Sequence, residues 1–190
     1  ESQGDMTVVD PVTGDPIYVL FSNPPGNDIN AGAGNDLIHA GIGADAIDGG
    51  EGFDVVDYSL ANGAVAIDLE AGKGTLGYAK GDSYTNVEGV IGSAFDDTLK
   101  GDAKDNSFDG GAGADVLDGG AGFDTVDYSA AAAGVTVSLD GSAGSGDIAS
   151  GDRLSGVESV IGSNFNDVLT GTFSDDTLAG GLGNDTLSGG

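Results

Sequence analysis

The chain has 190 residues, of which 37 are glycine, against an ordinary share of about 7%. Thirty-two acidic residues against five basic ones give a net charge of −27, so nucleic acid and anionic membrane surfaces are poor partners. There is no cysteine, which excludes disulfides, zinc–thiolate sites and cysteine nucleophiles. No apolar run approaches the roughly 20 residues that span a bilayer. Because most of the acids are Asp, a short oxygen donor, bound metal is the obvious candidate for stabilising the fold.

Residues 1–21 form an N-terminal strand segment in which two short β-rich stretches, 7–9 and 17–21, flank a turn sequence at 10–16. Two interpretations stay open. The segment is either a cap over the first coil of the fold or a strand that leaves its own subunit and pairs with the sheet edge of a neighbour.

A nine-residue repeat of the form G-G-x-G-x-D-x-U-x occupies residues 22–59. Blocks that begin at Ala31, Ala40 and Gly49 carry glycine second and fourth, Asp sixth and an aliphatic residue eighth. Alternating glycines let six residues wrap tightly, and the next three form a very short strand. One block cannot bury its single aliphatic side chain, so the blocks must stack into a coil with a thin continuous core.

Two related modules follow, at 60–129 and 130–190, and residues 51–120 match residues 121–190 at 32 of 70 positions. Each module begins with an alternating stretch that predicts a longer strand, at 65–69 and at 135–139. A flexible loop (72–77 in the first copy), an irregular rung and another repeat run come next. We interpret four acids of the irregular rungs as solvated charge, with metal ligation as the alternative: Asp82, Glu88, Asp152 and Glu158.

A coil with two blocks per turn brings the sixth-position aspartates of every second block into register. Asp36 then lies against Asp54, and the corresponding pairs in the later runs are Asp97 with Asp115 and Asp167 with Asp185. Stacked carboxylates repel one another without a cation, and the thin core cannot overcome that repulsion. Ca²⁺ prefers roughly six to eight oxygen donors, which paired carboxylates and inward carbonyls can provide. Folding is therefore predicted to depend on metal.

The blocks resemble the nonapeptide repeats of the RTX (repeats-in-toxin) family. The resemblance implies an all-β, right-handed parallel β-roll or β-helix solenoid with several Ca²⁺ ions bound between its turns. It implies that carbonyls two and four and the Asp of one block join carbonyls one and three and the Asp two blocks later. The implied ligands are Gly32, Gly34 and Asp36 with Gly49, Glu51 and Asp54; Ser93, Phe95 and Asp97 with Gly110, Ala112 and Asp115; and Ser163, Phe165 and Asp167 with Gly180, Leu182 and Asp185.

Equivalent positions of other blocks add further ligands to this set: Gly41, Gly43, Asp45, Gly119, Ala121, Asp124 and Asp176. One of these sites departs from the pattern. Asp102, Lys104 and Asn106 would join Gly119, Ala121 and Asp124, but the Asn106 side chain carries no charge. Whether an ion binds there is left open.

Aromatic residues and the single histidine offer no catalytic constellation. Tyr58, Tyr128, Phe53 and Phe123 are interpreted as packing residues at the coil ends, and His39 takes the ninth, outward-facing position of its block. We therefore expect no enzymatic activity. The chain opens on Glu rather than Met and stops at the start of another block, so either it was cut from something longer or its subunits join head to tail.

Three functions stay open on this sequence. The first is a secreted, extracellular structural protein of a Gram-negative bacterium that folds on Ca²⁺ and polymerises with copies of itself into a filament or matrix. The second is a Ca²⁺-dependent secretion and folding module of a larger RTX toxin, protease, lipase or adhesin. The third is the repeat module of a polysaccharide-modifying enzyme, which the high negative charge disfavours for an anionic polysaccharide. Export through a type I system is implied by the resemblance alone.

Overall fold

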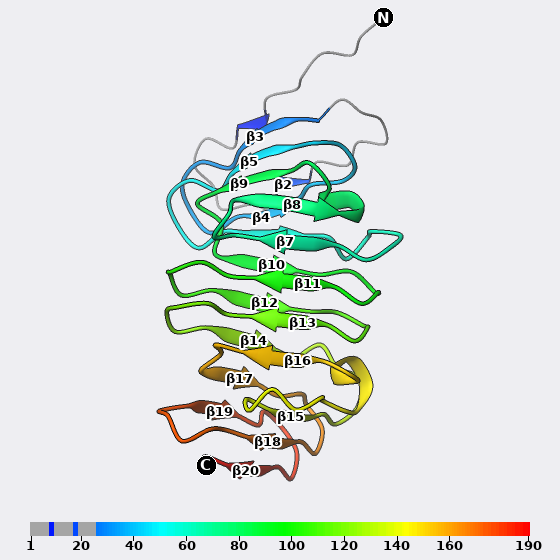
Figure 1. The fold of residues 1–190 in the computed structure, drawn as a ribbon, viewed down its shortest axis with the longest axis vertical. Coiled ribbons are helices and arrows are strands. Elements are labelled where there is room, and N and C mark those ends of the chain that lie inside the picture. Colours follow the sequence, from blue (N-terminus) through cyan, green and yellow to red (C-terminus); the bar gives the residue numbers. More distant parts are fainter. Residues whose placement is uncertain (1–7, 10–16, 19–25) are drawn as a thin grey trace, which may run out of the picture.

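A computed structural model describes residues 8–9, 17–18 and 26–190. These residues contain twenty short strands and two single-turn 3₁₀ helices, η1 (Gly77–Ala79) and η2 (Asp147–Ala149), with no α-helix among them. The strands stack as rungs along the long axis of the molecule (Figure 1). The predicted all-β parallel roll is therefore confirmed. Within the same residues, no helix has the length and apolarity to cross a membrane.

Three sheets make up the roll, and their strand orders follow the stacking of the turns. The first runs β1 (Val8–Val9), β3 (Asp28–Asn30), β5 (Ala46–Asp48), β9 (Ser83–Thr85), β8 (Lys73–Leu76), β7 (Ala66–Asp68), β11 (Thr98–Lys100), β13 (Val116–Asp118), β16 (Arg153–Ser155). The second runs β19 (Thr177–Ala179), β17 (Ser159–Ile161), β14 (Thr125–Asp127), β12 (Ser107–Asp109), β10 (Gly89–Ile91), β6 (Val55–Asp57), β4 (Leu37–His39), β2 (Ile17–Tyr18). The third is β15 (Thr136–Ser138), β18 (Val168–Thr170), β20 (Thr186–Ser188).

Parallel pairing sets the register of the repeat runs at two blocks per turn. Ile38 of β4 lies opposite Val56 of β6, and Leu99 of β11 lies opposite Leu117 of β13. All four side chains are fully buried, and the residues on either side of each are more exposed in most strands. Each strand therefore contributes one central side chain to the core, as the alternation of side chains across a strand requires.

The stretches between the repeat runs make an excursion out of this simple stacking. After β6 the chain enters β7, which pairs with the later strand β11. It then reverses through β8, which is antiparallel to β7, and β9 returns to pair with β5. The prediction of longer strands here is wrong, because β7 and β15 have three residues like their neighbours. The predicted flexible loop at 72–77 is also wrong, because it contains β8.

The two strands of the N-terminal segment extend the roll by one further rung. Strand β1 pairs in parallel with β3, and β2 pairs in parallel with β4, so the two lie in opposite sheets. The turn predicted at 10–16 lies outside the described residues. The inter-subunit role of the segment, and the division of the chain at residues 21, 59 and 129, stay predictions.

Candidate metal-binding ladder

Glycine is required where successive loops of the roll touch. Gly50 has φ +100°, and a Cβ at this position would lie 2.0 Å from the carbonyl oxygen of Gly32. A Cβ at Gly52, whose φ is +141°, would lie 1.8 Å from the carbonyl oxygen of Gly34. Both the backbone conformation and the space exclude larger residues. The first predicted ligand set is thus held in two loops in direct contact.

The sixth-position acids stack as the nine-residue period predicts, and we call this stack of acids along the roll the ladder. The backbone N–H of Asp36 donates to Oδ1 of Asp54 at 2.9 Å, which confirms the predicted register of that pair. The other pairs repeat this bond in the later runs: Asp97 to Asp115 at 2.8 Å, Asn106 to Asp124 at 2.7 Å, and Asp167 to Asp185 at 3.0 Å. In each pair, one carboxylate oxygen of the later Asp therefore accepts a hydrogen bond from the backbone of the residue 18 positions earlier.

The second carboxylate oxygen is the strongest indication that these loops bind a cation. Oδ2 of four aspartates is buried and has no hydrogen-bond partner among the residues described: Asp45, Asp54, Asp115 and Asp124. A buried carboxylate oxygen without a partner costs free energy, and a metal ion would remove that cost. No group of three or more acidic, His or Cys side chains gathers in the described residues, so backbone carbonyls must complete each shell. The residues thus fit a Ca²⁺ site built from two carboxylates and several carbonyls.

Electrostatics of the ladder lead to the same conclusion. Burial, together with neighbouring carboxylates, raises the pKa of Asp115 to about 7 and that of Asp124 to about 6. Burial also raises the pKa of Asp45 and Asp54 above their ordinary values. The protein alone therefore disfavours charge on these groups. A bound divalent cation would reverse that preference, because it stabilises the ionised form.

Two carbonyls of the first predicted site already accept hydrogen bonds across the loops. The Gly32 carbonyl accepts from the Glu51 N–H, and the Glu51 carbonyl accepts from the Gly34 N–H, both at 2.8 Å. Each carbonyl has a second lone pair, so these bonds do not prevent metal ligation.

Serine and threonine take over where the later blocks lose their glycines. Ser93 Oγ donates to Asp97 Oδ1 at 2.8 Å, and Ser163 Oγ donates to Asp167 Oδ1 at the same distance. Thr172 Oγ1 donates to Oδ2 of Asp176 at 3.0 Å. These carboxylates are hydrogen-bonded to their own loops, unlike the four with a free Oδ2.

The other predicted ligands lie in loops of the same kind, between consecutive strands of the roll. Asp45 accepts hydrogen bonds from the backbone and side chain of Asn27, beside Gly41 and Gly43, which both have positive φ. Oδ2 of the sixth-position Asp approaches the first residue of its own block in each regular run, where a Cβ on Gly49, Gly110, Gly119 or Gly180 would meet it at 2.5–2.6 Å. The third-position residues are all exposed, so their side chains do not enter the site and only their carbonyls are candidate ligands: Glu51, Ala112, Ala121 and Leu182. The carbonyls of Phe95 and Phe165 face Gly113 and Gly183.

The acids of the irregular rungs are not solvated, which corrects the interpretation from sequence. Asp82, Glu88 and Asp152 are buried, and Glu158 is half-buried. Asp82 Oδ1 accepts from the Asp45 N–H at 2.8 Å. Asp152 Oδ1 accepts in the same way from the Asp115 N–H at 2.9 Å. These acids take the place of sixth-position aspartates in rungs that lack the repeat.

Tyrosine hydroxyls complete two of these carboxylates, a feature that sequence reasoning missed. The Tyr58 hydroxyl donates to Asp82 Oδ2 at 2.5 Å, and the Tyr128 hydroxyl donates to Asp152 Oδ2 at 2.9 Å. Both tyrosines are buried, as packing residues should be. Phe53 and Phe123 are 37% and 45% exposed, so the same prediction is wrong for them.

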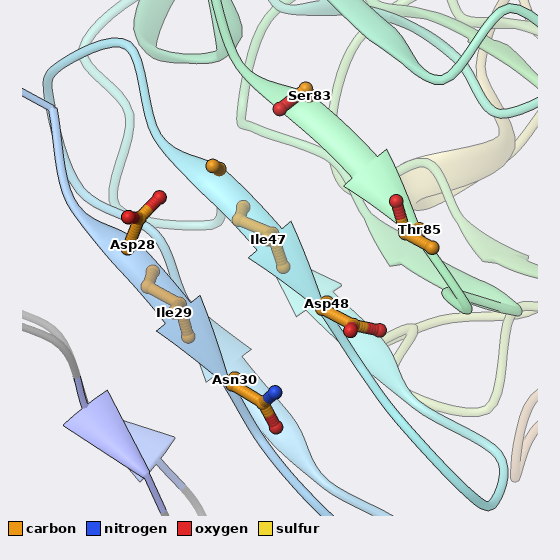
Figure 2. A pocket seen from close by; sticks show the side chains of 8 residues that line it. Asp28, Ile29, Asn30, Ile47, Asp48, Ser83 and Thr85 are labelled. Carbon is orange, nitrogen blue, oxygen red and sulfur yellow. The ribbon is translucent and has the colours of Figure 1, made fainter.

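Two polar features lie apart from the ladder. His39 Nδ1 lies 3.0 Å from Asp57 Oδ2 on the sheet formed by β4 and β6, and only 14% of its side chain is exposed. A hollow of about 320 Å³ lies over β3, β5 and β9. Figure 2 shows its lining, which includes Asp28, Asn30 and Asp48 but none of the predicted ligands.

Comparison with known families agrees with this geometry. The model of the RTX calcium-binding nonapeptide repeat matches in four copies over residues 26–56, 91–126 and 154–190, more than half of the chain. No curated protein matches the sequence. The family match covers the runs in which stacked aspartates and glycine loops recur, and it omits the whole excursion at 57–90. The chain therefore belongs to the family of RTX calcium-binding nonapeptide repeat proteins.

Proposed function

We propose that the chain is a non-enzymatic, extracellular structural protein whose β-roll folds when Ca²⁺ binds outside the cell. The observation that carries this proposal is the set of four buried aspartates whose Oδ2 atoms lack a partner among the described residues. A net charge of −27 opposes collapse of the metal-free chain, and one core side chain per strand gives little to offset it. RTX repeats are typical of secreted bacterial proteins, which supports an extracellular site of action.

The experiment is a far-ultraviolet circular dichroism measurement in chelator, followed by addition of Ca²⁺. We expect little β-structure in chelator and recovery of the β-spectrum with Ca²⁺. Mg²⁺ at the same concentration is the control, since it demands a tighter octahedral shell and keeps its waters. A metal-free chain with the same spectrum and thermal stability as the Ca²⁺-loaded chain would refute the proposal.

Head-to-tail self-assembly is the finer part of the proposal. Strand β20 pairs with β18 on one side, and its three residues are exposed. Leu182 and Leu187 are 70% and 49% exposed at the same end of the roll. An open strand edge with exposed apolar side chains favours pairing with another strand. A second copy would supply that strand through its own first rung.

Light scattering and electron microscopy in Ca²⁺ test the assembly. We expect long particles from the wild type and shorter ones from Leu187→Lys, which places a charge on the β20 edge. A wild type that stays monomeric at high concentration in Ca²⁺ refutes self-assembly and favours a folding module that acts within a larger RTX protein.

A further inference from the structure

The irregular rungs hold a second kind of acidic pair beside the regular repeats. The backbone N–H of Asp124 donates to Oε2 of Glu158 at 3.0 Å, and in the first module the N–H of Asp54 donates to Oε2 of Glu88 at 3.1 Å. These bonds have the geometry that joins sixth-position aspartates elsewhere in the ladder. Glu88 and Glu158 therefore occupy aspartate positions in rungs outside the nine-residue pattern.

A carbonyl from the same rung faces each of these acidic pairs. A Cβ on Gly119 would lie 1.9 Å from the carbonyl oxygen of Gly156 and 2.6 Å from Oδ2 of Asp124. A Cβ on Gly49 would lie 2.0 Å from the carbonyl oxygen of Asn86 and 2.6 Å from Oδ2 of Asp54. In the regular rungs this position is taken by the carbonyl of the first residue of the block one turn later. The Gly110 carbonyl, for example, lies beside Gly92 and Asp97.

Backbone conformation explains how so short a rung presents that carbonyl. Asn86 has φ +50° and Gly156 has φ +58°, so both adopt the left-handed conformation two residues before their glutamates. Asn is among the few non-glycine residues that tolerate this conformation. The longer side chain of Glu reaches the position that a full six-residue loop gives to Asp.

The two modules differ in how the pair is neutralised. Lys104 Nζ donates to Oε1 of Glu88 at 2.8 Å, and the equivalent residue 70 positions later is Ser174. The next acid position is Asn106 in the first module and Asp176 in the second. The first pair therefore has an ammonium group bonded to its glutamate, whereas no described residue places a cationic side chain on Glu158 in the second.

We propose that Asp124, Glu158 and the Gly156 carbonyl form an additional Ca²⁺ site in the second irregular rung, and that Lys104 replaces the ion at the equivalent position of the first. Asp124 is fully buried, and its Oδ2 has no hydrogen-bond partner among the described residues. By analogy with the regular sites, the carbonyls of Gly120 and Gly122 would add donors. The site lies in a rung that departs from the repeat, and the inference rests on the Ca²⁺ binding proposed above.

Exchange of the neutralising residue between modules tests this assignment. Ca²⁺ stoichiometry is measured by native mass spectrometry and by titration calorimetry for the wild type, Ser174→Lys and Lys104→Ser. Relative to the wild type, we expect one ion fewer in Ser174→Lys and one more in Lys104→Ser. Both positions are exposed, so folding should be retained, and circular dichroism in Ca²⁺ checks that it is.

A second pair of variants removes the proposed ligand itself. Glu158→Gln keeps the hydrogen bond to the Asp124 N–H and should lose one ion, whereas Glu88→Gln should lose none. If the wild type binds Ca²⁺ and all four variants keep its stoichiometry, the additional site is refuted while Ca²⁺-dependent folding stands. A wild type that binds no Ca²⁺ refutes both.

Discussion

Replacement of Tyr128 with Phe removes one hydroxyl from a fully buried contact. Tyr128 is 1% exposed, Asp152 is 0% exposed, and the hydroxyl donates to Asp152 Oδ2 at 2.9 Å. The other oxygen of Asp152 accepts from the Asp115 N–H, so it cannot compensate. A hydrogen bond to a charged group contributes about 1.5–3 kcal/mol, and its loss leaves a buried carboxylate oxygen without a partner. We expect the free energy of unfolding to fall by about that amount.

Tyr58→Phe is the matched control, because the first module has a second hydroxyl. Tyr84 Oη lies 2.7 Å from Tyr58 Oη, and the Tyr84 hydroxyl also lowers the pKa of Asp82, so it helps to stabilise that carboxylate. The residue equivalent to Tyr84 in the second module is Leu154. Asp82 therefore keeps a hydroxyl partner in Tyr58→Phe, and we expect a loss of about 0.5–1.5 kcal/mol, the net value of an ordinary hydrogen bond.

Thermal unfolding in saturating Ca²⁺ measures both losses. One kcal/mol corresponds to roughly 2–4 °C for a chain of this size, so Tyr128→Phe should lower Tm by about 3–12 °C and Tyr58→Phe by less. Adding Tyr84→Phe to Tyr58→Phe should bring the first module to the larger loss. Equal Tm shifts for Tyr58→Phe and Tyr128→Phe would refute the reasoning, because the spare hydroxyl would then have no effect.

Two further predictions concern charge in the ladder. Asp115→Asn keeps an oxygen for the Asp97 N–H but removes a charged ligand, so Ca²⁺ titration should show one weakened or lost ion, and the small β-content in chelator should stay equal or rise. Unchanged Ca²⁺ binding would contradict the assignment. The pH dependence in chelator follows from folded-state pKa values of about 7 for Asp115 and about 6 for Asp124, both above the ordinary 3.8. The folded chain then holds protons that the unfolded chain releases, so this stabilisation is complete below about pH 4 and is lost as pH rises through about 6 to 7. In chelator, the circular dichroism spectrum should therefore show more β-structure at about pH 5 than at about pH 8, and the opposite order would overturn the assignment.

Constant block length is the reason that the regular part of the ladder could be predicted from sequence. Asp36 and Asp54 are 18 residues apart, and their hydrogen bond follows directly from two nine-residue blocks per turn. The glycines that permit the contact, such as Gly50 against the Gly32 carbonyl, are conserved positions of the same nine-residue pattern within this chain. Local pattern and tertiary register thus carry the same information in these runs.

The irregular rungs could not be predicted, because their partners are set by the excursion through β7 and β8. Asp82 bonds to Asp45 across 37 residues, and Glu88 bonds to Asp54 across 34, neither of which is a multiple of nine. The contact between Tyr58 and Asp82 depends on β9 returning to β5, which no local periodicity indicates. The sequence repeats the same tyrosines and acids in both modules, which indicates that they matter to the fold. That repetition does not identify which acid each tyrosine contacts.

Partners of the carboxylate oxygens differ along the ladder, and this difference determines where metal dependence should concentrate. Ser93 satisfies Asp97 within its own loop, Tyr128 satisfies Asp152, and Lys104 pairs with Glu88. None of these contacts needs a metal ion. Asp115 and Asp124 retain an oxygen that only a group from outside the described chain can satisfy. Because each turn of a solenoid contacts only its neighbours, removal of Ca²⁺ should loosen the turns around such aspartates first and leave the hydroxyl-bonded turns for last.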